Sequence, residues 1–277
     1  MGKKLTLTLA AGITLALGIA VIAIAYETPY VSTCLRSTIS EGSDCQGFPG
    51  LIANFGALVV PKKLPKREMA PVAIKLWGEV STSDGTHPSA LREATIDFDR
   101  NIAINANGLP VCHPSIEVPI QKACSNSIIG GGKADFELAS PEARPVLNPS
   151  RLAIYNAGIT SGITTLYVVA PINVPAPSTI LVRVEIKRIH EGRYGLQAVA
   201  RIPVIAGGSG SLLDLSLKVK RLFSYKGSQK SYAMARCPNR QLNAKISALF
   251  KNEAHEPGAA PTTLIQGAVV SPCVATS

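Results

Sequence analysis

Residues 180–189 read ILVRVEIKRI, and this stretch shows the pattern that decides the fold. Apolar, mostly β-branched side chains alternate with Arg183, Glu185 and Lys187, so the charged residues share one face of an extended strand. A period of two residues recurs throughout the chain, whereas no stretch repeats apolar residues at helical spacing over a dozen positions. The other stretches with strand character are 55–60, 72–80, 96–99, 127–138, 151–156, 166–169, 194–202, 215–225, 231–236, 243–250 and 263–270.

Turn-forming sequences separate these stretches, among them Asp84-Gly85, Asn107-Gly108 and the glycine-rich run 207–210. With 46% hydrophobic and 17% charged residues, the composition excludes a disordered chain, which would be poor in apolar side chains. About a dozen short strands with regular turns predict an all-β fold. We expect an antiparallel two-sheet sandwich, or two smaller sandwich-like halves, over residues 50–277.

The N-terminal segment is set apart by its composition. Lys3 and Lys4 precede an uncharged apolar run, residues 5–25, that ends in Ala23-Ile24-Ala25. This pattern predicts a secretory signal peptide over residues 1–25, cleaved after Ala25. The run is also long enough to span a bilayer as a helix, so a single-pass N-terminal membrane anchor is the alternative. In both interpretations the remaining chain is exported, as a secreted or cell-envelope protein.

Six cysteines lie beyond the signal segment, and an even number in an exported chain predicts three disulfides. Six cysteines allow 15 pairings, and pairing between sequence neighbours is the arrangement we expect. The segment 26–49 then becomes an irregular region held by its own disulfide. No CxxC motif accompanies the cysteines, so we predict no metal site and no cofactor. The predicted pairs are Cys34–Cys45, Cys112–Cys124 and Cys237–Cys273.

Local catalytic motifs are absent from the sequence. None of its four histidines belongs to an HExxH motif, and there is no GxSxG sequence. Gly130-Gly131-Gly132-Lys133 lacks the flanking residues of a phosphate-binding loop, and its glycines fit a bulge or a tight strand crossing better. Asp97 and Asp99 share one face of a strand, which we expect to be solvated. We therefore predict no catalytic residue, but a catalytic group assembled from distant residues would leave no local trace.

The positive charge is concentrated near the C-terminus. The whole chain carries a formal charge of +10, yet Leu215–Asn252 contains nine basic residues and no acidic residue. These basic residues alternate with aromatic side chains, among them Phe223 and Tyr225. Six of them form our candidate polyanion-binding site: Lys218, Lys220, Arg221, Lys226, Lys230 and Arg236.

Two explanations fit this basic segment. Lysines and arginines on exposed strands can simply keep sheet edges from aggregating. Alternatively they form a patch that binds an anionic partner. For an exported protein we expect an anionic cell-wall polymer or acidic polysaccharide rather than nucleic acid, with membrane contact only through the N-terminal segment if it stays uncleaved. The expected function is non-enzymatic surface binding, and a secreted hydrolase with a dispersed catalytic group is the alternative.

Two groups of short motifs resemble a group of exported, β-rich actinobacterial proteins that have no assigned function. The resemblance covers roughly residues 50–255, and its motifs are turns and cysteines rather than catalytic residues. It implies export and a β fold, and it implies no activity. The motifs are Asp97-Phe98-Asp99, Asn107–Cys112, Cys124, Ile129-Gly130, Ile205–Gly210, Phe223–Gly227, Ser231-Tyr232 and Arg236-Cys237-Pro238.

Overall fold

A computed structural model describes residues 30–35, 45–46, 50–115, 118–140, 143–174, 176–251 and 262–276, with the backbone alone for the first two ranges. The protein is all-β, with 69% strand and 5% helix, which confirms the predicted fold class. The strands are β1 (Tyr30–Leu35), β2 (Cys45–Gln46), β3 (Leu51–Val60), β4 (Lys63–Pro65), β5 (Ala70–Pro71), β6 (Ala73–Thr82), β7 (Ala90–Asp99), β8 (Ile102–Ile104), β9 (Ile128–Ser140), β10 (Ala143–Thr160), β11 (Ile163–Ile172), β12 (Ser178–Glu191), β13 (Tyr194–Arg201), β14 (Gly210–Val219), β15 (Leu222–Tyr225), β16 (Ser228–Ser231), β17 (Ala233–Ala235), β18 (Gln241–Lys251), β19 (Thr262–Pro272) and β20 (Val274–Thr276). The short helices are α1 (Ile120–Ala123), η1 (Ser125–Ser127) and η2 (Ala206–Gly208).

Thirteen of the strands form a single sheet in the order β1-β19-β18-β7-β13-β12-β11-β10-β9-β14-β6-β3-β2. Only β1 runs parallel to its neighbour, β19, and the other pairs in this sheet are antiparallel. The run β9 to β13 is built from successive hairpins, so each strand lies beside the next one in the chain.

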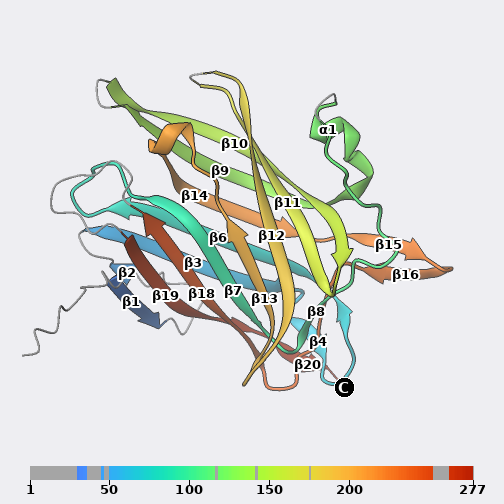
Figure 1. Ribbon diagram of the computed structural model, residues 1–277. Helices are drawn as coiled ribbons and strands as arrows, with labels where there is room; N and C mark the ends of the chain where they lie inside the picture. Colours follow the sequence, from blue (N-terminus) through green and yellow to red (C-terminus); the bar gives the residue numbers. More distant parts are fainter. Residues whose placement is uncertain are drawn as a thin grey trace, which may run out of the picture.

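The sheet curls until its two sides meet, and the molecule is nearly barrel-shaped (Figure 1). At the seam β3 lies beside β19, where the Val59 amide donates a hydrogen bond to Ser271 Oγ over 3.0 Å. Ala57, Ile246 and Val269 pack together behind this contact. The expected two-sheet sandwich is therefore corrected. One sheet wraps around a common interior, because β14 pairs with β9 and β7 pairs with β13, so that strands distant in sequence continue both edges of the β9–β13 hairpins.

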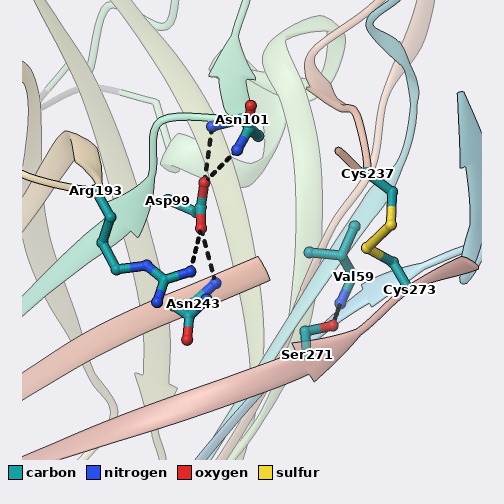
Figure 2. The surroundings of a disulfide bond; sticks show 8 residues. All are labelled: Val59, Asp99, Asn101, Arg193, Cys237, Asn243, Ser271 and Cys273. Atoms are coloured by element: carbon teal, nitrogen blue, oxygen red, sulfur yellow. Dashed lines mark hydrogen bonds and ion pairs between the residues drawn. A yellow bond between two sulfur atoms is a disulfide. The ribbon is translucent and has the colours of Figure 1, made fainter. Parts of the chain in front are cut away.

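Short strands close one end of the barrel. A three-stranded sheet, β5-β17-β8, and the pair β20-β4 lie there, near the end of the chain (Figure 1). The disulfide Cys237–Cys273 ties the segment after β17 to the end of β19 (Figure 2). This end contains a large part of the main core cluster, including Leu64, Val72 and Leu242.

The carboxylates of β7 lie in a buried network rather than on a solvated face. Asp97 is 6% exposed and accepts a hydrogen bond from Gln197 Nε2 over 2.8 Å. Asp99 is 2% exposed; it accepts bonds from the backbone and side-chain nitrogens of Asn101 and from the Asn243 amide, and lies 3.6 Å from Arg193 Nη2 (Figure 2). The expectation of solvation was wrong because Gln197 and Asn243, which bond to these carboxylates, come from β13 and β18, strands that are distant in sequence.

Two of the three predicted disulfides are present, Cys112–Cys124 and Cys237–Cys273. Cys34 and Cys45 belong to β1 and β2, but their side chains lie outside the described residues, and their pairing stays a prediction. These two strands extend the main sheet, so part of the segment 26–49 is regular strand. Disulfides are typical of proteins that fold in an oxidising compartment.

The predicted signal segment 1–25 lies outside the described residues. Within the part of the chain that the structure describes, no helix has the length and apolar character needed to cross a membrane.

Three consecutive glycines, Gly130 to Gly132, allow close packing of β9 against both neighbouring strands. A Cβ atom at Gly132 would lie 1.9 Å from the Ser216 carbonyl oxygen, and one at Gly130 would lie 2.3 Å from that of Lys218. A register shift occurs beside Gly130, between Ile154 and Tyr155 of β10. These glycines are thus structural, as their interpretation as a bulge or close strand approach predicts.

Candidate functional site: an apolar chamber inside the sheet

The alternation of side chains along the long strands directs one face of the sheet into the barrel. There it encloses a chamber of about 190 Å³. Residues of β3, β6 to β8, β10 to β14 and β18 line it, so the chamber has walls on every side of the barrel. Among the described residues its lining consists of aliphatic and aromatic side chains and glycine, and those with a polar side-chain atom are Trp77 and Tyr232.

Small side chains keep part of this interior open. Ala94 of β7 lies opposite Ala200 of β13 on one side and opposite Ala248 of β18 on the other. All three line the chamber, and Ala198 adds a fourth short side chain on the same wall. Barrels of about eight strands are filled by their own side chains, whereas wider ones enclose space. The larger number of strands and the row of alanines together explain why the interior is not filled.

Tyr232 is fully buried at the boundary between β16 and β17. Burial raises the pKa of its phenol far above the ordinary value, so the hydroxyl stays protonated. Its oxygen has no hydrogen-bond partner among the described residues. Tyr232 therefore belongs to the chamber wall, with its neutral hydroxyl packed away from the open space.

The chamber can hold a small apolar molecule. Apolar cavities of about 150 Å³ stay empty of water and bind molecules the size of benzene. A bound water needs two to four polar partners, and among the described residues that line the chamber only Trp77 and Tyr232 carry a polar side-chain atom. The arrangement thus favours hydrocarbon over water.

The predicted basic residues are only partly brought together. Lys218 lies directly opposite Lys75 on the outer face of β14 and β6, and both line two shallow hollows of about 260 and 280 Å³. Lys220 lines the first hollow and Trp77 the second. The described ion pairs include none of these lysines. We call Lys75, Lys218 and Lys220 the basic groove.

The remaining predicted residues lie elsewhere. The expected continuous strand 215–225 is interrupted, since β14 ends at Val219 and β15 pairs with β16 in a separate hairpin. Lys226 and Lys230 are exposed on that hairpin. Arg236 is half-buried and donates to Asn101 Oδ1 over 2.9 Å. Arg221 is half-buried, and its Nε has no partner among the described residues.

An acidic cluster lies on β6, β9 and β14, and two of these strands, β6 and β14, also carry Lys75 and Lys218 of the basic groove. Asp214 of β14 is opposite Glu79 of β6 and Asp135 of β9. Partial burial, together with the neighbouring charges of Asp135 and Glu79, raises the pKa of the Asp214 carboxyl. Within the described residues no group of three or more histidines, cysteines and carboxylates has the geometry to hold a metal ion.

Ser211, His87 and Glu137 form a hydrogen-bonded chain that sequence motifs did not reveal. His87 Nδ1 lies 2.6 Å from Glu137 Oε1, and His87 Nε2 lies 3.0 Å from Ser211 Oγ. This is the order of side chains found in serine hydrolases. The strands place Ser211 opposite Glu137, and the connection between β6 and β7 brings in His87.

The hydrogen bonds of this cluster favour a structural role. Ser211 Oγ lies 2.5 Å from the Pro88 carbonyl oxygen, a contact that requires the serine proton to lie between the two oxygens. The serine proton is thus directed at the Pro88 backbone and not at His87 Nε2, so the histidine is not placed to take it up. Ser211 is also only 1% exposed. We interpret the cluster as a clasp that ties the connection between β6 and β7 to β9 and β14.

No family model, no curated protein and no solved structure matches this chain. The resemblance to exported actinobacterial proteins therefore stays a prediction.

Proposed function

We propose that this protein binds an apolar small molecule, or the hydrocarbon part of a larger one, inside the chamber. The observation that carries the proposal is an interior space of about 190 Å³ whose described lining is hydrocarbon apart from the side chains of Trp77 and Tyr232. Burial of each CH₂ group contributes about 0.8 kcal/mol. A ligand thus gains affinity from its size rather than from charge.

The two disulfides support the further proposal that the protein acts outside the cytoplasm, secreted or bound to the cell envelope. The predicted signal peptide also favours export. N-terminal sequencing of the protein from its native cells tests whether this peptide is cleaved. A start near Tyr26 supports cleavage, whereas an intact N-terminus together with membrane fractionation supports the anchor.

A homologous series of linear methyl ketones tests binding in the chamber. At about 0.8 kcal/mol per CH₂, affinity rises about fourfold for each added carbon until the chamber is full, and then levels off. Calorimetric titration of the purified protein measures both the rise and the limit. Absence of saturable binding across the series would contradict the proposal, and so would a rise without a limit.

A second candidate function is attachment to an anionic polymer of the cell surface through the basic groove. It is supported by Lys75 lying directly opposite Lys218, because like charges at opposed positions destabilise a sheet. Such a pair is explained if an anionic group of the polymer lies between the two lysines. Lys220 at the same hollow adds a third positive charge.

Charge reversal tests this second function. The double variant Lys75→Glu/Lys218→Glu should lose binding to an acidic polysaccharide, and binding of the unmodified protein should weaken with salt. A matched control, Lys245→Glu/Lys251→Glu, makes the same change in net charge at two exposed positions of β18. Equal binding by the two double variants would show that net charge, not the groove, is responsible.

A further inference from the structure

Exposed aliphatic side chains gather at the end of the barrel opposite the disulfide Cys237–Cys273. They lie near the start of β10, around the connection between β11 and β12, and in the segment before β14, all at the same end of the molecule (Figure 1). Their exposed fractions are between 37% and 61%, and they are five of the ten large apolar residues exposed in the described part of the chain. We call them the apolar tips: Val146, Leu147, Val174, Leu181 and Val204.

Contacts with the body of the barrel hold the apolar tips in place. The Val174 amide donates a hydrogen bond to Asn148 Oδ1 over 3.1 Å, which joins the connection between β11 and β12 to β10. Ile205, next to Val204, is buried in the core cluster that also contains Ile172. The tips are therefore exposed on a firmly packed base.

Charged residues flank the segments that carry the tips. Residues 145–150, 171–182 and 202–213 contain no lysine, arginine, aspartate or glutamate, and arginines stand directly beside them: Arg144, Arg151, Arg183 and Arg201. Arg144 and Arg151 are exposed and take part in none of the described ion pairs. Aliphatic side chains bordered by arginines complement an anionic bilayer, because the first enter the boundary of the acyl chains and the second attract the headgroups.

We propose that the apolar tips dock this end of the barrel on the surface of an anionic lipid bilayer. The inference goes beyond the proposed function, since it concerns the outside of the barrel and holds whether or not the chamber binds a ligand. It adds a membrane contact to the N-terminal segment, through which alone the sequence predicts one. The two contacts are compatible, because the strand register places Tyr30, the first residue of β1, at the same end as Arg201.

Hydrogen exchange followed by mass spectrometry tests the docking with vesicles of equal parts of phosphatidylglycerol and phosphatidylcholine. The method reports contact locally, so an uncleaved N-terminal segment does not obscure the result. Backbone amides of residues 144–150, 171–182 and 202–205 should exchange more slowly with these vesicles, and much less so with phosphatidylcholine alone. Amides of residues 158–162 and 274–276, at the other end, should exchange as before.

Serine substitutions test the apolar contribution. Leu147→Ser/Val204→Ser changes two side chains that are 56% and 61% exposed, so the fold should tolerate it. It should raise the lipid concentration needed for half-maximal protection by about 10- to 100-fold, because less apolar surface enters the bilayer. The matched control, Ile159→Ser/Val274→Ser, changes two exposed aliphatic residues at the other end and should leave that concentration unchanged.

Glutamine substitutions test the electrostatic contribution. Arg144→Gln/Arg151→Gln should raise the same lipid concentration by about 30-fold, the effect expected for two arginines near an anionic surface. The control Lys187→Gln/Arg188→Gln makes the same change in net charge at two exposed positions of β12 and should have little effect.

Three outcomes would overturn the inference. The first is that the tips gain no protection with vesicles of either composition. The second is that a test variant, of either kind, behaves like its control. The third is a dimer of the unmodified protein, seen by size-exclusion chromatography, that Leu147→Ser/Val204→Ser dissociates, because the tips then bind a second copy of the chain.

Discussion

Substitution of Ala198 by leucine should raise the stability of the folded protein if the interior is open and lower it if the interior is filled. Ala198 lies on β13 with its side chain in the chamber, and it is 8% exposed. Leucine adds three carbon atoms at this position. At about 0.8 kcal/mol per buried carbon, they stabilise the ligand-free protein by about 2 kcal/mol if the space is open. In a filled core the same addition costs about 1–3 kcal/mol because neighbouring side chains must move.

The chamber has room for this change. At about 24 cal/mol per Å³, an empty space of about 190 Å³ lowers the stability of the folded protein by about 4–5 kcal/mol. This loss is larger than the stabilisation expected from the three added carbon atoms of leucine. For a chain of this size each kcal/mol shifts the midpoint of thermal unfolding by about 2–4 °C. We therefore expect calorimetry to show a rise of about 4–8 °C for Ala198→Leu. The ketone series should also reach its limit at a shorter chain.

Ala134→Leu is the matched control. Ala134 is also buried, at 1% exposed, but it packs in the cluster with Phe136 and Leu152 and does not line the chamber. The same substitution should lower the stability there by about 1–3 kcal/mol. A loss of stability in both variants would refute the existence of an open chamber in solution.

Three further predictions concern the charged and hydrogen-bonded clusters. Asp214→Asn should stabilise the protein by about 0.2–1 kcal/mol at neutral pH, since it removes a like-charge contact. Because folding raises the pKa of Asp214, its ionised carboxyl destabilises the folded protein only as the pH rises above the unfolded value of 3.8. Chemical denaturation in which the variant stayed more stable at lower pH would contradict this explanation. Ser211 should not react with a fluorophosphonate probe. Ser211→Ala should lower the stability of the folded protein by about 1 kcal/mol through loss of the clasp. Specific labelling of Ser211 would instead establish the hydrolase alternative. Asp99→Ala should cost about 3 kcal/mol in urea denaturation, since it leaves buried donors from Asn101 and Asn243 without an acceptor; a loss below about 1 kcal/mol would show that these bonds contribute little.

The sequence was sufficient to predict most of the long strands and the Cys112–Cys124 disulfide, because both depend on local information. A period of two residues identifies a strand such as β12 wherever it lies in the fold. The short spacing between Cys112 and Cys124 favours their pairing in the same way. The closure of the sheet depends instead on which strands are neighbours, and periodicity carries no information on that point.

The candidate sites show the same limit. Ala94, Ala200 and Ala248 are scattered in sequence, and only the strand register brings them side by side to open the chamber. Lys75 was missed because it lies far from the basic segment and meets Lys218 only through the pairing of β6 with β14. The burial of Tyr232 without a partner is likewise a property of the assembled barrel, since its sequence neighbours give no sign of it.

The most direct test of the central claim is a calorimetric titration of the purified protein with pentyl methyl ketone at several temperatures, repeated with Ala198→Leu. The account predicts one saturable site per chain in the unmodified protein, with a negative heat-capacity change from burial of apolar surface. It also predicts that Ala198→Leu, which fills part of the chamber, binds the ketone far more weakly. Absence of saturable binding to the unmodified protein, or equal affinity in the two proteins, would contradict it.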